Sequence, residues 1–445
     1  RQLRATVVYC AWRRTVRLVV WTRGHSYPLD DTSIPHQSGR TTLDGPLWPV
    51  QWTAGRGSQE AGVDDSLEST LDGHIPQQRT ELASAALPAS VVAVTFAKHL
   101  LALAFPLLAL VFVLTGPHSA WWSLPFLVVI AAAVRSDRRS DRELSQPNVR
   151  MPAWPFDALL ITLSVLQLVN VALLARMMSM QSFWSVDTFV ATVVVGSSSA
   201  YSGIVVAHEL IHRPRRAWRT LGRLLLVTVC YEHFYTEHVR GHHVRVGTDA
   251  DPATARFGES FAQFYRRTVP AQFKSAWRLE TTRLGDVAMK WYDVRLLKSR
   301  VVHGLLAQVL LLAAIGFAAG PAAGVVFLMQ SVWASRALEV VNYFEHWGLR
   351  RSSVRVLPID SWDTHSRFTY YALTGLSRHA DHHAFAARPY QQLRVWEQSP
   401  TLPFGYLGMF PLVLMRNARF QEVMTAELRR RRLGPFADSA TTASA

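Results

Sequence analysis

Cysteine is nearly absent from this 445-residue sequence, which contains only Cys10 and Cys230. Two cysteines cannot build a disulfide framework or a thiolate iron or zinc module. The sequence also lacks a G-x-G-x-x-G segment that opens a βαβ unit, so it offers no nicotinamide or flavin site of that kind. A redox centre in this chain would therefore need other ligands and a separate electron carrier.

Charged side chains are missing from six long runs in a chain that is 49% hydrophobic. The runs occupy residues 99–115, 120–134, 158–175, 188–207, 304–320 and 321–335. Each is near the length of about 20 residues that an α-helix needs to cross a bilayer, although the second run is short. A tight AAGPAAG turn joins the last two. We therefore predict an all-α integral membrane protein with about six transmembrane helices.

Arginine placement predicts how these helices are oriented. The loop between the second and third runs contains Arg135, Arg138, Arg139, Arg142 and Arg150. By the positive-inside rule this loop faces the cytoplasm, as do the arginine-rich segments after the fourth and sixth runs. The net charge of +15 could also indicate nucleic acid, but arginines beside membrane spans are explained by anionic lipid headgroups. We expect a multi-pass protein of the inner cell membrane with a cytoplasmic helical cap.

The two ends of the chain differ in composition from the membrane domain. Residues 1–88 start without Met, show no signal-peptide core with a small-residue cleavage site, and run into a stretch rich in Gly, Ser, Asp and Gln. Such a composition is typical of disorder. We predict a disordered or artefactual extension over 1–88, a membrane domain over 89–428 and a flexible basic or polar tail over 429–445.

Histidines are concentrated at the cytoplasmic ends of the predicted spans. The 17 histidines include four groups, in VAHELIHR, TEHVRGHH, NYFEHWGL and LSRHADHH. Their members are His208, His212, His238, His242, His243, His346, His379, His382 and His383. Residues three or four apart share a face of a helix, so His238 and His242, for example, should point in one direction. The repeated pattern on one side of the membrane indicates a shared metal site, which requires the fourth and sixth spans to be neighbours.

Other metal sites explain less of the pattern. HELIH alone matches the H-E-x-x-H signature of zinc peptidases, in which Glu209 would be the general base. That site leaves seven of the nine histidines unexplained, and zinc takes only about four ligands. Nine imidazoles would instead supply two metals with four or five ligands each. A metal transporter would place ionisable residues in mid-membrane, whereas these histidines lie at the ends of the predicted spans. His233 and His365 are candidates to orient a ligand.

The position of the histidines also bears on their chemistry. Imidazole binds zinc, copper, iron and nickel, so the ligand type does not choose the metal. A metal at the membrane surface beneath apolar helices can meet a hydrophobic substrate from the bilayer. Hydrolysis would need water delivered there, whereas oxidation needs only O2, so the setting favours a di-iron oxidising enzyme. The run GSSSAYSG at 196–203 either lines a substrate channel or lets helices pack closely.

The four histidine motifs resemble those of the membrane-bound alkane 1-monooxygenases, a branch of the integral-membrane fatty acid desaturase and hydroxylase superfamily. The likeness covers roughly residues 90–428 and includes HVRVGTDADPATARFGESFAQF and RPYQQLRVWEQSPTLPFGY. It implies that all nine histidines bind two non-haem irons. It also implies terminal hydroxylation of an n-alkane, or a related medium or long hydrophobic chain, to a primary alcohol with O2 and two electrons.

Two departures from the family pattern leave the substrate open. Trp347 follows the histidine of the third motif, where the family usually has Tyr, and Ser377 stands where it usually has Gln. The alternatives are an alkyl-aromatic hydroxylase or a lipid or fatty acid desaturase of the same superfamily. The motif NYFEHWGL favours a hydroxylase.

The resemblance also implies an electron donor. The family takes electrons from rubredoxin, which an NAD(P)H-dependent rubredoxin reductase reduces. Because this chain has no four-cysteine cluster, its rubredoxin must be a separate protein. Rubredoxins are typically acidic, so the basic stretch 240–300 is either a dock for one or a contact for lipid headgroups.

Overall fold

The computed structural model describes residues 88–147 and 151–437, which form helices joined by loops. Within these residues the only β-type pairing consists of two isolated bridges, so the predicted all-α fold is confirmed. The predicted extension lies outside the described residues except for Pro88, which precedes the first described helix.

Six helical segments are long and apolar enough to cross a membrane, as predicted. In chain order they are α2 (Ala89–His99) with η1 (Leu100–Leu103) and α3 (Ala104–Thr115), α4 (Ala120–Arg138), α5 (Ala153–Met178), α6 (Val186–Ser199) with η2 (Ala200–Val205) and α7 (Val206–Ile211), α12 (Arg300–Ala319) and α13 (Pro321–His346). Several extend beyond their apolar runs, because a helix continues through polar residues that can pack or reach water. The helix α13 thereby carries the third histidine motif at its end.

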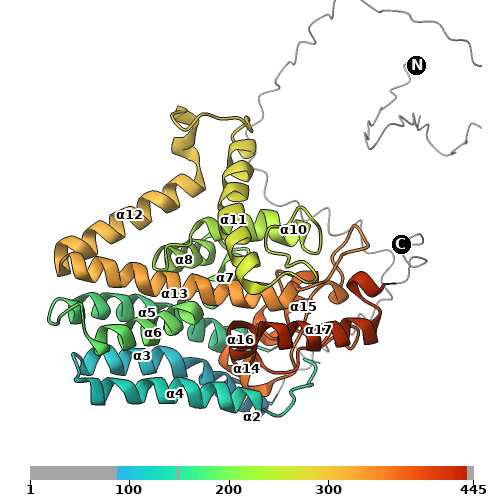
Figure 1. The fold of residues 1–445 in the computed structure, drawn as a ribbon, viewed down its shortest axis with the longest axis horizontal. Helices are drawn as coiled ribbons and strands as arrows, with labels where there is room; N and C mark the ends of the chain where they lie inside the picture. Colours follow the sequence, from blue (N-terminus) through green and yellow to red (C-terminus); the bar gives the residue numbers. More distant parts are fainter. Residues whose placement is uncertain (1–87, 148–150, 438–445) are drawn as a thin grey trace, which may run out of the picture. The chain divides into compact units, whose positions relative to one another are not determined.

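The spans form a bundle in which α6 packs against α13 (Figure 1), so the predicted contact between the fourth and sixth spans is confirmed. Gly196 lies in this contact, since a Cβ atom there would come within 2.8 Å of the Trp333 side chain. The small residue therefore permits the close approach. Gly320 joins α12 to α13 with a positive φ of 90°, which favours glycine, and Pro321 begins α13.

The remaining helices lie toward the end of the bundle that carries His208 and His346, here called the histidine end (Figure 1). They are α8 (Arg216–Val227), α9 (His233–Glu237), η3 (His238–His242), α10 (His243–Arg245), α11 (Phe261–Arg283), η4 (Val294–Lys298), η5 (Pro358–Asp360), α14 (Arg367–Ala372), α15 (His379–Ala384), η6 (Tyr390–Gln392), α16 (Tyr406–Met415), α17 (Asn417–Arg431) and η7 (Gly434–Phe436). Most of them are short, and loops connect them around the four histidine motifs.

Two segments of the described chain, η2 and η3, are π-helical. The segment η2 lies in the fourth span just before His208, and η3 carries two histidines of the second motif. A π-helical turn takes more residues than an α-helical turn, so it changes which side chains share a face. Such segments occur frequently at functional sites.

The described chain ends in packed structure. Leu428 of α17 is buried, and Phe436 of η7 packs edge-on against Phe257 with ring centroids 5.7 Å apart. Residues 429–437 of the predicted flexible tail therefore pack against the protein through apolar contacts. Residues 438–445 lie outside the described part of the chain.

Candidate metal centre

The nine predicted ligands meet in one place, as two adjacent groups. The first group contains His208, His212, His238, His243 and His382, and the second contains His242, His346, His379 and His383. Within each group the candidate ligand atoms all lie within 4.8 Å of one another. The groups are adjacent because the rings of His243 and His383 stack with centroids 4.4 Å apart. The division matches the expectation of two metals with four or five ligands each.

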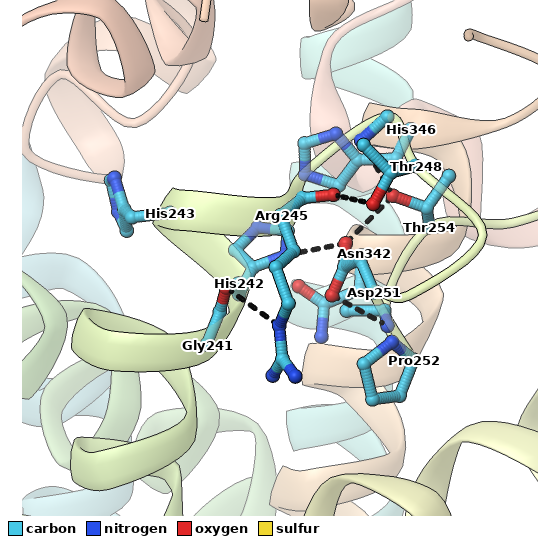
Figure 2. A network of polar contacts seen from close by, with 12 residues as sticks. Gly241, His242, His243, Arg245, Thr248, Asp251, Pro252, Thr254, Asn342 and His346 are labelled. Carbon is cyan, nitrogen blue, oxygen red and sulfur yellow. Dashed lines mark hydrogen bonds and ion pairs between the residues drawn. The ribbon is translucent and has the colours of Figure 1, made fainter. Parts of the chain in front are cut away.

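Consecutive histidines of the second motif enter different groups. The π-helical segment η3 places His238 beside His243, five residues further on, with their Nε2 atoms 3.0 Å apart. His242 joins the other group, and Figure 2 shows His243 on the opposite side of the chain from it. His238 and His242 still face the same way, as their spacing predicts, with ring centroids 5.3 Å apart, but they belong to different groups of the centre.

The helix α15 divides its histidines in the same way. His379 and His383, four residues apart, join the second group. His382 turns to the first group, where its Nε2 atom lies 3.1 Å from Nε2 of His243. The two histidines of HELIH stay together in the first group, as their spacing predicts. The second and fourth motifs thus contribute to both groups, whereas the first motif contributes only to the first group and the third motif only to the second.

The nitrogens of the two groups fit metal ions. Nε2 of His346 lies 3.2 Å from Nε2 of His379, so two ring nitrogens face each other in a buried place. Nε2 atoms of His208, His212 and His242 are buried and have no hydrogen-bond partner in the described chain. Buried polar atoms normally have such a partner, and converging imidazole nitrogens are a donor set that divalent transition metals bind.

Burial keeps these imidazoles neutral. Removal from water lowers the pKa of His212 to about 3, and the nearby His242 adds to this shift. Burial, followed by repulsion from neighbouring rings, lowers the pKa of five further candidate ligands. These are His238, His243, His379, His382 and His383. A neutral imidazole offers the lone pair that a metal requires.

Asp251 orients one candidate ligand (Figure 2). Its Oδ2 atom lies 2.9 Å from Nδ1 of His242 and accepts a hydrogen bond from the Thr254 hydroxyl at 2.6 Å. The backbone N–H of Ala253 donates to Oδ1 at 3.1 Å. This carboxylate favours a proton on Nδ1 and leaves Nε2 of His242 available to a metal. Sequence reasoning missed Asp251, whose only signal is its place in a stretch that resembles family sequence.

Glu345 has the corresponding position beside His379. Its Oε1 atom lies 3.3 Å from Nδ1 of His379 and accepts a hydrogen bond from the Tyr406 hydroxyl at 2.5 Å. The side chains of Glu345 and Tyr406 are both buried. The sequence signal for Glu345 is the carboxylate directly before His346 in NYFEHWGL, which by itself cannot be told from an ordinary residue at a helix end.

The carboxylate of Glu209 is engaged away from the histidines. Its Oε1 atom pairs with Nη2 of Arg213 at 2.6 Å and accepts the backbone N–H of Tyr390 at 3.3 Å. A peptidase would need this carboxylate free to activate a metal-bound water. The observed pairing therefore disfavours the zinc peptidase interpretation of HELIH.

Two other predicted histidines lie outside the centre. The ring of His233 packs against Tyr231 and Phe273, with centroids 4.5 and 5.4 Å away. Nδ1 of His365 lies 2.7 Å from the guanidinium of Arg142. In the described part of the chain neither ring contacts one of the nine candidate ligands, so the prediction that they orient a ligand is not supported by their positions.

An apolar cavity of about 380 Å³ reaches both histidine groups. Its wall includes His208 and His238 of the first group and His379 of the second. Most of the remaining wall is apolar and comes from the fourth and sixth spans and from α16. Examples are Ile204, Val340, Val341, Leu407 and Phe410. A hydrophobic molecule in this cavity would lie directly beside the candidate metal ligands.

The small-residue run at 196–203 contributes both to the cavity and to helix packing. Ser197, Ala200 and Tyr201 line the cavity. Gly203 instead packs closely, since a Cβ atom there would come within 2.9 Å of the Val229 side chain. Some residues of this run therefore line the cavity, and others allow close helix packing.

Two histidine groups that could each hold a metal thus lie beside an apolar cavity between helices long enough to cross a membrane. The fatty acid desaturase family model matches residues 182–412 of this chain, a range that contains all nine histidines. The class is thus that of the integral-membrane desaturases and their relatives.

Curated relatives define the branch more narrowly. Alkane 1-monooxygenase 1 of Pseudomonas aeruginosa is 41% identical over 227 residues, which cover 50% of this chain and 59% of that protein. Alkane 1-monooxygenase 2 of the same organism is 35% identical over 340 residues, which cover 68% of this chain and 86% of that protein. Alkane 1-monooxygenase 2 of Alcanivorax borkumensis is 38% identical over 229 residues, covering 50% and 59%. The chain belongs to the alkane 1-monooxygenase family.

Proposed function

We propose that this protein hydroxylates the terminal carbon of n-alkanes, or of related medium or long hydrophobic chains, to give primary alcohols. One oxygen atom of O2 enters the C–H bond, and the other leaves as water after taking up two electrons and two protons. The observation that carries the proposal is the apolar cavity whose wall contains histidines of both groups. A hydrocarbon can reach the metal ligands through it without passing through water.

In this proposal the nine histidines hold two non-haem irons, which supply the activation of O2. The protein's own side chains position the ligands. Asp251 orients His242 by a hydrogen bond, and Glu345, which accepts the hydroxyl of Tyr406, lies 3.3 Å from Nδ1 of His379. The apolar wall excludes water and gives the hydrocarbon no polar partner, so the substrate is held by burial of its surface. The relatives' names and the converging imidazoles support this assignment.

Electrons are proposed to come from a separate rubredoxin, reduced by an NAD(P)H-dependent reductase. A surface groove of about 400 Å³ is lined by residues of α11 and of the loop before it, and its wall includes Asp251. Three cations in the groove, Arg256, Lys274 and Arg278, are exposed and form no ion pair with a described carboxylate. An acidic carrier bound there would lie close to Asp251 and its partner His242.

The histidine end is proposed to face the cytoplasm of a cell with this protein in its inner membrane. Asp137 near the end of α4 accepts hydrogen bonds from Ser366 and Thr369, which join the end of α4, with its arginines, to the segment that precedes the fourth histidine motif. By the positive-inside rule these arginines support a cytoplasmic position. A soluble rubredoxin and its reductase could then reach the groove.

Desaturation is the alternative, favoured by the match to the fatty acid desaturase family model. A desaturase would remove two hydrogens from a chain and release an alkene, with both oxygen atoms of O2 leaving as water. The products therefore separate the two reactions.

Product analysis tests the proposal. Iron-loaded protein, rubredoxin, its reductase and NADPH are incubated with a panel of hydrocarbons under ¹⁸O2, and the products are identified by mass spectrometry. A primary alcohol carrying ¹⁸O is the expected result. An unlabelled alkene would show desaturation instead, and the absence of any product from reduced, iron-loaded protein would refute both. Protein with His382→Ala serves as the inactive control, because it lacks a candidate ligand.

A further inference from the structure

Glu339 is a carboxylate of the sixth span, α13, and its side chain is fully buried. Charged residues within membrane helices are costly, and they commonly mark a contact that the protein uses. In the described part of the chain no lysine or arginine forms an ion pair with Glu339. The cation one turn earlier on α13, Arg336, instead lies over the rings of Phe261 and Tyr265, with both centroids 5.3 Å from its guanidinium carbon. The negative charge of Glu339 therefore needs another partner.

Three neutral side chains surround the carboxylate with hydrogen-bond donors. Its Oε1 atom accepts the Tyr231 hydroxyl at 2.8 Å and Nε2 of Gln272 at 2.9 Å. Its Oε2 atom accepts Nε2 of Gln272 at 3.1 Å and Nδ2 of Asn342 at 3.3 Å. Amide nitrogens can only donate, so this arrangement matches an ionised carboxylate, which accepts at both oxygens. These donors solvate the charge of Glu339 without neutralising it.

The helix α13 places this charge close to the candidate metal centre. Glu339, Asn342 and His346 follow one another at spacings of three and four residues, so they share one face of the helix. Seven residues from Glu339 to His346 correspond to about 10 Å along the helix axis. Screening by salt is weak between buried charges, so a charge at this distance still acts on a metal at the second histidine group.

The centre has little other negative charge to draw on. The nine candidate ligands are imidazoles, which bind metals in their neutral form, so bound metals would bring uncompensated positive charge into a buried region. Glu209 pairs with Arg213 at 2.6 Å, and Glu237 pairs with Arg245 at 2.8 Å. Arginines thus already compensate these two buried carboxylates. Glu339 has no such partner, and its charge remains available to the metals.

We propose that Glu339 balances the positive charge of the metal centre, and that it thereby lowers the reduction potential of the centre and raises its affinity for metal. A nearby negative charge stabilises the oxidised, more positive state of a metal more than the reduced state. Glu339 acts through space in this role, without binding a metal itself. This inference rests on the proposed two-iron centre and adds to it a residue outside the nine histidines.

The test uses Glu339→Gln, which removes the charge and nearly keeps the shape. The reduction potential of iron-loaded wild type and variant is measured by redox titration followed by Mössbauer spectroscopy. Iron retention is measured by dialysis against a graded series of chelator concentrations. The variant should have a higher potential and at least about tenfold weaker iron binding, as loss of a unit charge roughly 10 Å away at an effective dielectric constant of about 20 requires. Glu339→Asp, which keeps the charge, should recover most of both properties.

Glu280→Gln and Tyr231→Phe are the matched controls. Glu280 is also buried, but it pairs with Arg283 at 2.7 Å and lies two turns further along α11 than Gln272, so its loss should leave the potential unchanged. Tyr231→Phe removes a hydrogen bond to Glu339 but no charge, and its potential should stay near that of the wild type. A wild-type potential in Glu339→Gln would overturn the inference. An equal shift in Tyr231→Phe would also overturn it, because the effect would then come from packing.

A second variant covers the case in which Glu339→Gln does not fold. Gln272→Lys places a cation against the carboxylate and cancels its charge without removing it, because Nε2 of Gln272 already lies 2.9 Å from Oε1 of Glu339. The potential should rise in this variant too, and a wild-type value would overturn the inference. If iron-loaded wild type converts no hydrocarbon, the proposed hydroxylase function fails. The potential and the iron retention then still decide the role of Glu339.

Discussion

Replacement of Asp251 by Asn is expected to weaken metal binding in the second histidine group without unfolding the protein. Asn has nearly the same size as Asp but carries no negative charge. Three donors converge on the carboxylate, from Nδ1 of His242, the hydroxyl of Thr254 and the backbone of Ala253. An amide has one oxygen, so in either orientation its NH2 group faces at least one of these donors.

The expected size of the effect follows from this geometry. A hydrogen bond to a charged group contributes about 1.5–3 kcal/mol. Loss of such a partner of a metal-ligating histidine typically lowers metal affinity or activity by about 10- to 100-fold. Asp251 is only 3% exposed, so water cannot replace the lost acceptor. We expect at least about a tenfold loss of iron affinity in Asp251→Asn.

The measurement is the number of irons per chain after dialysis against a graded series of chelator concentrations, together with alkane turnover. Asp249→Asn is the control, because Asp249 is two residues away, its side chain is 82% exposed, and its ion pair with Arg350 spans 3.6 Å. Exposed pairs of this kind contribute little to stability. Iron retention and turnover in Asp251→Asn that equal those of Asp249→Asn would refute the reasoning.

Three further predictions follow from the site and the bundle. Purified protein should contain about two irons and no stoichiometric zinc, since nine imidazoles exceed the capacity of a zinc site; metal analysis showing one zinc and no iron would contradict this. Glu209→Gln should keep a higher turnover rate per mole of protein than His208→Ala. Glu209 pairs with Arg213 and lies outside the candidate ligand set, whereas His208 is a candidate ligand. Gly304→Ala should lower the thermal unfolding temperature, since its Cβ would overlap the carboxylate of Glu232, at a cost of about 1–3 kcal/mol. Gly316→Ala on the same helix meets nothing within 4 Å and should not.

The membrane spans could be predicted from sequence because the bilayer sets their length. Six uncharged runs near that length appear as six helices in the structure. Their ends were less predictable. The helix α13 continues to His346 although its apolar run ends at residue 335, because packing against α6 and α11 also accommodates polar side chains.

The nine histidines could be identified from their spacing and from the family resemblance, but their assignment to two groups could not. Local spacing predicts His238 and His242 on one face, and their ring centroids do lie 5.3 Å apart. Nε2 of His238 also lies 3.0 Å from Nε2 of His243, which in turn lies 3.1 Å from Nε2 of His382 in a distant segment. Which nitrogens converge on one point therefore depends on segments that are far apart in the chain.

Local composition and short spacing were enough to predict the membrane class, the number of spans and the candidate ligands. The carboxylates beside those ligands and the residues that line the cavity became evident only from the folded chain. Glu345 lies beside His379 although the two belong to separate segments, and Asp251 reaches His242, nine residues earlier, through the turns after α10. The cavity wall likewise combines residues of the fourth and sixth spans and of α16. The spacing of residues along one helix does not predict contacts of this kind.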